Sequence, residues 1–127
     1  MGCRVHVIKK HAEYGDSEAF NWNAHEFHAL LDILGCDVCG EEYADDFECT
    51  VESYKDAVKV VAVLKKGDEA RADQLLDKIS EERSTGDLSD VKGQLEECGG
   101  IDYVLDAMVS FLVERDKDSN WISFCAF

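Results

Sequence analysis

Both ends of the chain alternate between apolar and more polar residues, a pattern typical of β-strands. The alternation covers residues 3–9 and residues 121–127. Successive side chains of a strand point to opposite faces, so each segment would turn one face towards a core. Trp121, Phe124 and Phe127 in the second segment favour a pleated surface. We therefore expect the two terminal strands to pair with each other.

Between these strands, apolar residues recur at intervals of three and four, which predicts amphipathic helices. The second predicted helix has the widest apolar stripe and the fifth is strongly amphipathic, so these two would form the centre of the core. Five helices are expected, four of them over about residues 24–34, 51–66, 88–98 and 101–115. The third would begin after Asp68, face Ala72, Leu75, Leu76 and Ile79 inward, and lead through residues 81–83 into a turn at residues 84–86.

Residue types that commonly occupy the N-cap position precede three of these helices. Asn23 would cap the first helix, and Glu26 lies at the position that completes a capping box. Thr50 and Asp68 would cap the second and third helices. Glycine often ends a helix because it adopts left-handed backbone angles without strain. It follows the first, second and fourth predicted helices, at Gly35, Gly67 and Gly99–Gly100.

These elements predict an α+β fold that is mostly helical, with a small sheet that pairs the N- and C-terminal strands. Phe47-Glu48-Cys49 is a candidate for a third strand. A chain of 127 residues can bury a core without cross-links, so we expect one globular domain over residues 1–127. No apolar run approaches the roughly 18 residues of a membrane-spanning helix, and the first residues do not resemble a secretory leader. A cytoplasmic protein is therefore expected.

Acidic and basic residues are distributed unevenly along the chain. The chain carries 28 acidic and 13 basic residues, a formal net charge of −15. Residues 1–12 contain three basic residues and no acidic one, whereas residues 13–54 contain twelve acidic residues and neither Lys nor Arg. Such crowding destabilises the folded state by repulsion, which indicates a use beyond solubility. A charge of this sign also repels nucleic acid and anionic membranes, so direct binding of either is not expected.

The densest acidic stretch follows the first predicted helix and reaches into the second. Its carboxylates would attract an Arg- and Lys-rich surface, as a phosphate backbone does. We expect a non-enzymatic acidic binding protein that acts as a nucleic-acid mimic, an inhibitor or antagonist of a basic, nucleic-acid-handling protein complex. The simpler alternative is a solvated surface that only keeps the protein soluble. The predicted partner-binding residues are Asp37, Glu41, Glu42, Tyr43, Asp45, Asp46, Glu48 and Glu52.

The sequence Cys36-Asp-Val-Cys39-Gly40 has the spacing of half a zinc knuckle. Further ligands would have to come from His25 and His28, one helical turn apart, or from Cys49. The alternative is that these cysteines are free buried thiols. Apart from zinc no cofactor is expected, and a small zinc-stabilised interaction module is an alternative function.

A Cys/His-dependent enzyme is a further alternative. The predicted terminal strands bring several thiols and imidazoles near one another, namely Cys3, Cys125, His6 and His11. Against this, the chain contains no P-loop, nucleophile elbow, dinucleotide fingerprint or metalloprotease motif. We therefore expect no enzymatic activity and assign no catalytic residue.

Overall fold

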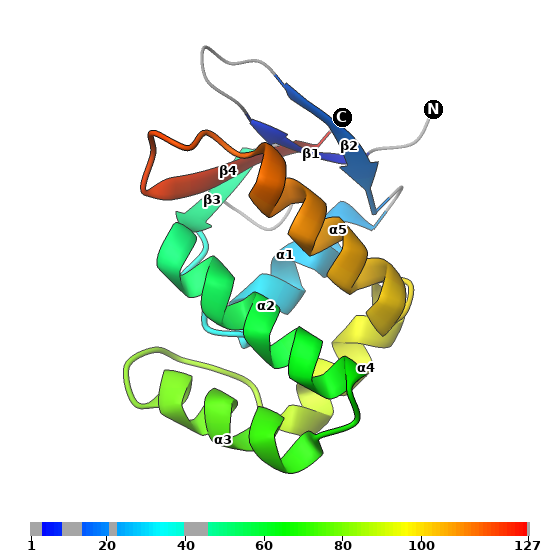
Figure 1. Ribbon diagram of the computed structural model, residues 1–127, viewed down its shortest axis with the longest axis vertical. Helices are drawn as coiled ribbons and strands as arrows, with labels where there is room; N and C mark the ends of the chain where they lie inside the picture. The colour runs from blue at the N-terminus through cyan, green and yellow to red at the C-terminus, as the bar shows by residue number, and fades with distance from the viewer. Residues whose placement is uncertain (1–3, 9–13, 21–22, 40–45, 127) are drawn as a thin grey trace.

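The computed structural model describes residues 4–8, 14–20, 23–39 and 46–126, and it confirms a mostly helical α+β fold (Figure 1). The five helices predicted from the apolar periodicity all form at the predicted places. In chain order the elements are β1 (Val5–Ile8), β2 (Tyr14–Ala19), α1 (Ala24–Ile33), β3 (Asp46–Thr50), α2 (Val51–Lys65), α3 (Glu69–Ser80), α4 (Leu88–Glu97), α5 (Ile101–Glu114) and β4 (Trp121–Ala126).

The four strands described form one antiparallel sheet in the order β2-β1-β4-β3. The two terminal strands pair at its centre, as predicted, with His6 opposite Cys125 and Val7 opposite Phe124. β3 pairs with the other side of β4 over its whole length, which confirms the candidate third strand. The sheet therefore joins the two ends of the chain to a segment from its first half.

β2 is not predicted by the sequence pattern, because its residues, YGDSEA, do not alternate between apolar and polar. It forms because β1 offers a strand edge and α5 packs beside it. Gly15 shows how closely these elements approach: a Cβ added there would lie 2.8 Å from Val7 Cγ1 and against the Glu114 carboxylate. The strand conformation of β2 is thus imposed by its neighbours.

The sheet forms one layer of the molecule and the helices form the other (Figure 1). In Figure 1 helices α1, α2 and α5 lie directly beneath the sheet, while α3 lies at the far end of the molecule. Alternate residues of a strand point to opposite faces, so the sheet has an apolar inner face and a more polar outer face. The buried inner face is built from Val5, Val7, Phe47, Cys49, Ile122 and Phe124.

Phe27 of α1 lies at the centre of an aromatic cluster beneath the sheet. Its ring centroid is 4.3 Å from that of Phe20 and 5.5 Å from that of Phe124 on β4. α2 and α5 meet beside this cluster, where the buried Tyr54 hydroxyl donates to the Met108 carbonyl at 2.7 Å. The hydrogen bond satisfies a hydroxyl that burial would otherwise leave unpaired. α2 and α5 are central, as predicted.

The predicted caps of α2 and α3 are confirmed. Thr50 Oγ1 accepts a hydrogen bond from the Ser53 amide at 3.3 Å, and Asp68 Oδ1 accepts one from the Arg71 amide at 3.1 Å. The helix ends expected at glycines are also confirmed, since left-handed backbone angles occur at Gly35, Gly67, Gly99 and Gly100.

The predicted cap of α1 is wrong. The Asn23 side chain makes no capping hydrogen bond, and its Nδ2 instead donates to the Glu97 carbonyl at 3.3 Å. That carbonyl belongs to the last turn of α4, where backbone oxygens lack partners within the helix. Glu26 does not complete a capping box, and its Oε1 lies 2.8 Å from His25 Nε2. Contact between α1 and α4 thus draws the amide away from its own helix.

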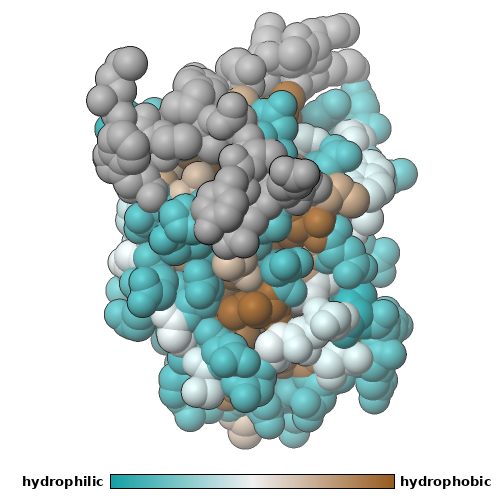
Figure 2. Space-filling view, turned by 180° about the vertical axis from the view of Figure 1, so that it is seen from behind, coloured by the Kyte–Doolittle hydropathy of each residue, from teal (hydrophilic) through white to brown (hydrophobic). Residues whose placement is uncertain are grey.

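No helix among the described residues is long and apolar enough to cross a membrane. Figure 2 shows the back of the molecule, where hydrophilic side chains cover most of the coloured surface and apolar residues appear near its centre. The exposed large apolar side chains are Tyr103, Val109, Val113 and Trp121.

Candidate functional site

Four of the predicted partner-binding carboxylates lie on β3 or on the segments that flank it. Asp46 and Glu48 stand on the strand itself, and Glu52 follows in the first turn of α2. Asp37 comes from the loop after α1, which is held against β3 by backbone hydrogen bonds between Cys39 and Glu48 of 2.8 and 3.0 Å. We call these four residues the acidic edge. The other predicted residues, Glu41, Glu42, Tyr43 and Asp45, lie outside the described residues.

β3 turns its carboxylates outward because of its alternating sequence. Phe47 and Cys49 are buried on the inner face, so Asp46 and Glu48 point to the outer face. β3 is also the last strand in the sheet order, and among the described residues only the bridge at Cys39 pairs with its open side. Alternation and edge position together make these carboxylates accessible to a partner.

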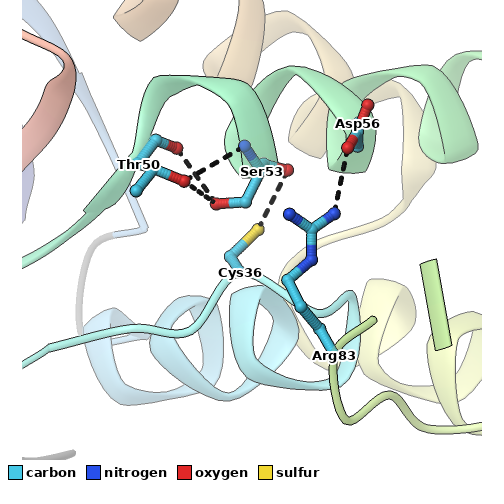
Figure 3. A network of polar contacts seen from close by, with 5 residues as sticks. All are labelled: Cys36, Thr50, Ser53, Asp56 and Arg83. Atoms are coloured by element: carbon cyan, nitrogen blue, oxygen red, sulfur yellow. Dashed lines mark hydrogen bonds and ion pairs between the residues drawn. The ribbon is translucent and has the colours of Figure 1, made fainter. Parts of the chain in front are cut away.

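A polar network fixes the backbone that carries the other two carboxylates (Figure 3). Cys36 Sγ donates to the Ser53 carbonyl at 3.5 Å, which ties the loop before Asp37 to α2. Ser53 also exchanges hydrogen bonds with Thr50 at the start of the helix. Asp37 and Glu52 are therefore anchored beside β3 instead of being carried on a free loop.

Lysine and arginine residues of the described chain form no ion pair with the acidic edge. Their ion pairs involve other carboxylates: Arg4 with Glu18, Lys65 with Asp102, Arg83 with Asp56 and Lys92 with Glu69. Within the acidic edge, Glu48 Oε2 accepts a hydrogen bond from Ser123 Oγ at 2.9 Å. None of these four carboxylates forms an ion pair with a described lysine or arginine, although Glu52 shares an open hollow with Lys55, Arg115 and Lys117.

Burial separates the two cysteines of the predicted zinc knuckle, Cys36 and Cys39. Cys36 lies in the core, and contact with the Cys49 thiol, together with burial, raises the pKa of Cys36. Cys39 is exposed, and its thiol donates to the Asp37 carbonyl at 3.9 Å.

The two candidate histidines have other neighbours. His25 lies against Glu26, and the buried His28 packs its ring 5.3 Å from that of Phe47. In the described part of the chain no three residues of the types His, Cys, Asp and Glu come close enough together to hold a metal ion. Zinc stays a prediction.

The outer face of the sheet carries a row of chemically active side chains that the sequence analysis identified only in part. His6 lies opposite Glu18 on one side and opposite Cys125 on the other. Asp46 of the acidic edge lies opposite Cys125 from β3. We call Glu18, His6, Cys125 and Asp46 the outer row. His6, Cys125 and Asp46 are candidates already indicated by the sequence, whereas Cys3 and His11 lie outside the described residues.

An open hollow of about 420 Å³ lies on the outer face beside this row. It adjoins Cys125, because its lining residue Asp46 is the cross-strand partner of Cys125 and Ser123 is two residues away on β4. Carboxylates and apolar groups contribute to the same wall. The lining residues are Ile8, Cys39, Asp46, Phe47, Glu48, Ser123 and Phe124.

Alkaline pH is expected to destabilise the protein. Burial raises the pKa of Cys98 from 9.0 to about 12, and burial also raises the pKa of Tyr54. The folded state therefore keeps protons that the unfolded chain releases, so the free energy of unfolding should fall as pH rises from about 9 towards 12. Urea unfolding at several pH values measures this slope. In Cys98→Ala the slope should be smaller by up to about 1.4 kcal/mol per pH unit, and an unchanged slope would show that the Cys98 thiol does not contribute to it.

No protein-family model matches the chain, and neither a curated protein nor a solved structure matches it.

Proposed function

We propose that this chain is a non-enzymatic acidic binding protein that docks onto a basic protein surface through the acidic edge. The observation that carries the proposal is the set of four carboxylates on β3 and its flanking segments, none of which forms an ion pair with a described lysine or arginine. Mutual repulsion of these charges destabilises the isolated protein, and a basic partner would relieve it. Two opposite unit charges at 4 Å attract by about 4 kcal/mol where the effective dielectric constant is near 20.

The positions of the carboxylates favour binding over mere solubility. A solubilising charge can stand anywhere on the surface, whereas Asp37 and Glu48 are held on backbone that is hydrogen-bonded to neighbouring elements. Fixed charges lose less entropy on docking than charges on a free loop. Complementary charge also speeds association and makes it dependent on salt.

The partner class follows from the sign and spacing of the charges. Carboxylates at every second residue of a strand are about 6.6 Å apart, and a single DNA strand carries one phosphate per about 3.4 Å of helix axis. The acidic edge offers a sparser version of that pattern to lysines and arginines that bind nucleic acid. The chain would therefore act as an inhibitor or antagonist of a basic, nucleic-acid-handling protein complex. The reducing cytoplasm suits it, because Cys36, Cys39, Cys49 and Cys98 are free thiols.

Charge reversal at the acidic edge is expected to remove binding to a polycationic probe such as poly-lysine. Asp37→Lys, Asp46→Lys and Glu52→Lys change side chains that make no described ion pair. Affinity at physiological salt should fall at least tenfold, and the dependence of affinity on salt should become weaker. Isothermal titration at several salt concentrations measures both quantities.

A matched control separates the position of the charges from their number. Asp73→Lys, Asp77→Lys and Glu96→Lys alter exposed residues of α3 and α4 and shift the formal net charge by the same amount, from −15 to −9, since each of three reversals adds two. The affinity of this control variant for the polycationic probe should fall by less than about threefold. Equal losses in both variants would mean that binding follows net charge alone, and the acidic edge would then not be the interface. Reversal at Glu41, Glu42 and Asp45 extends the test to the segment between Cys39 and Asp46.

A further inference from the structure

The outer row places a thiol, an imidazole and a carboxylate on adjacent strands of the sheet. Cys125 of β4 and His6 of β1 are cross-strand partners, and His6 is also the partner of Glu18 on β2. Directly opposed side chains of an antiparallel pair have Cβ atoms about 4.5–5.5 Å apart, so the imidazole can reach both neighbours. The same order of groups, with an acid orienting a base and the base beside a nucleophile, activates thiols in proteins.

The Glu18 carboxylate lies beside the His6 imidazole. Its Nε2 lies 3.9 Å from Glu18 Oε2, a separation at which charges attract although no hydrogen bond forms. Arg4 lies 3.6 Å from the other oxygen of Glu18 and holds that carboxylate on the outer face. His6 is only 8% exposed, whereas the Glu18 side chain is 49% exposed, so solvent screens part of the attraction between them.

We propose that Cys125 is a nucleophilic thiol, that His6 accepts its proton, and that the adjoining hollow takes a small neutral or cationic carbon electrophile. This inference does not depend on the proposed partner binding. Glu18 is a positioning residue that stabilises the imidazolium formed when His6 takes the proton.

The reaction is a substitution at carbon. A bond forms between Cys125 Sγ and the electrophilic carbon, while the bond from that carbon to its leaving group breaks and the leaving group departs with the electron pair. The thiol proton passes to His6 and then to water, so that His6 returns to its neutral form. The thiolate is the reacting species, and a nearby imidazolium increases its population at neutral pH.

Charge in the hollow decides which electrophiles can approach. Asp46 faces Cys125 from β3, and Glu48 lines the same hollow. Both carboxylates repel an anionic electrophile, whereas Ile8 offers apolar contact to a neutral one. Asp46 also opposes formation of the thiolate, so it restrains the reactivity that His6 promotes.

The protein contains its own comparison thiols. Cys39 is exposed and lines the same hollow, but the contact of its thiol is with the Asp37 carbonyl and not with an imidazole. Cys49 is buried on the strand next to β4 and reports any opening of the sheet. Cys125 should therefore react faster than Cys39 although it is less exposed, and Cys49 should not react.

The test measures alkylation of each cysteine by iodoacetamide in the folded full chain, with peptide mass spectrometry at low conversion and pH about 7.5. In His6→Gln the rate at Cys125 should fall at least tenfold while the rate at Cys39 stays the same. Asp46→Asn should raise the Cys125 rate about threefold, and Glu18→Gln should lower it by a similar factor. A purely structural role for these residues would not move the rate in opposite directions.

Reagent charge supplies a second, independent measurement. Iodoacetate has nearly the size of iodoacetamide but carries a negative charge, so its rate relative to iodoacetamide at Cys125 should rise in Asp46→Asn. The proposal is overturned if Cys125 reacts no faster than Cys39, or if His6→Gln leaves the Cys125 rate unchanged with Cys49 still protected. If His6→Gln opens the sheet and exposes Cys49, the test depends on the alkylation rate of Cys125 in Glu18→Gln and in Asp46→Asn. Equal Cys125 rates in these two variants would overturn the proposal.

Discussion

A chain that ends at Asn120 is expected to lose cooperative unfolding altogether. The truncation removes β4, which lies between β1 and β3 and pairs with both. Ile122 and Phe124 are fully buried, and burial of each such side chain stabilises a protein by about 1.5–3 kcal/mol. Backbone groups of β1 and β3 would also lose their partners beside the core. The summed loss approaches the roughly 5–15 kcal/mol that stabilises a typical domain.

Thermal denaturation followed by circular dichroism measures this loss. The matched control is Trp121→Ala, because Trp121 is the first residue of β4 and its side chain is 40% exposed. The control should melt cooperatively within a few degrees of the wild-type protein. A truncated chain that did the same would show that β4 is dispensable and that the sheet does not depend on its central strand.

Phe27→Ala is expected to lower the free energy of unfolding by about 3–5 kcal/mol. Phe27 is fully buried, and its ring lies among rings from four other elements or loops. Removing it leaves a cavity that these rings can refill only in part. The ring neighbours are Phe20, Phe47, Phe111 and Phe124, with centroid distances between 4.3 and 6.2 Å.

Urea unfolding of Phe27→Ala beside Val113→Ala provides the measurement and its control. Val113 is 66% exposed on α5, so its truncation should change stability by less than about 0.5 kcal/mol. A loss below about 1 kcal/mol in Phe27→Ala would mean that this ring is not central to the core.

Local sequence patterns were sufficient to predict the helices and the pairing of the chain ends. α2 and α5 follow from their apolar stripes, and their starts and ends follow from Thr50, Gly67 and Gly100. β2 could not be predicted in this way, because its residues carry no strand pattern. Its conformation depends on contacts with β1 and α5. Local patterns also misplaced the Asn23 side chain, because the competing Glu97 carbonyl is distant in sequence and near in space.

The candidate sites divide in the same way. The acidic edge was largely predicted, because Asp46, Glu48 and Glu52 are close in sequence. The outer row was not predicted as a row, because its arrangement depends on the register of three strand pairs. It also includes Glu18, which stands on β2, a strand without a sequence pattern. Sequence indicates that His6 and Cys125 belong to pairing strands, but not that they stand opposite each other.

The position of β4 also limits when the protein can fold during its synthesis. β1 is made near the start of the chain, and its central neighbour in the sheet is made more than a hundred residues later. The helices depend on local contacts and can form early, whereas closing so long a loop is slow. Until β4 leaves the ribosome, the inner faces of β1 and β3 lack the strand that joins them. The nascent chain therefore exposes apolar strand edges while the residues between β1 and β4 are being made, and it needs protection from aggregation during that interval.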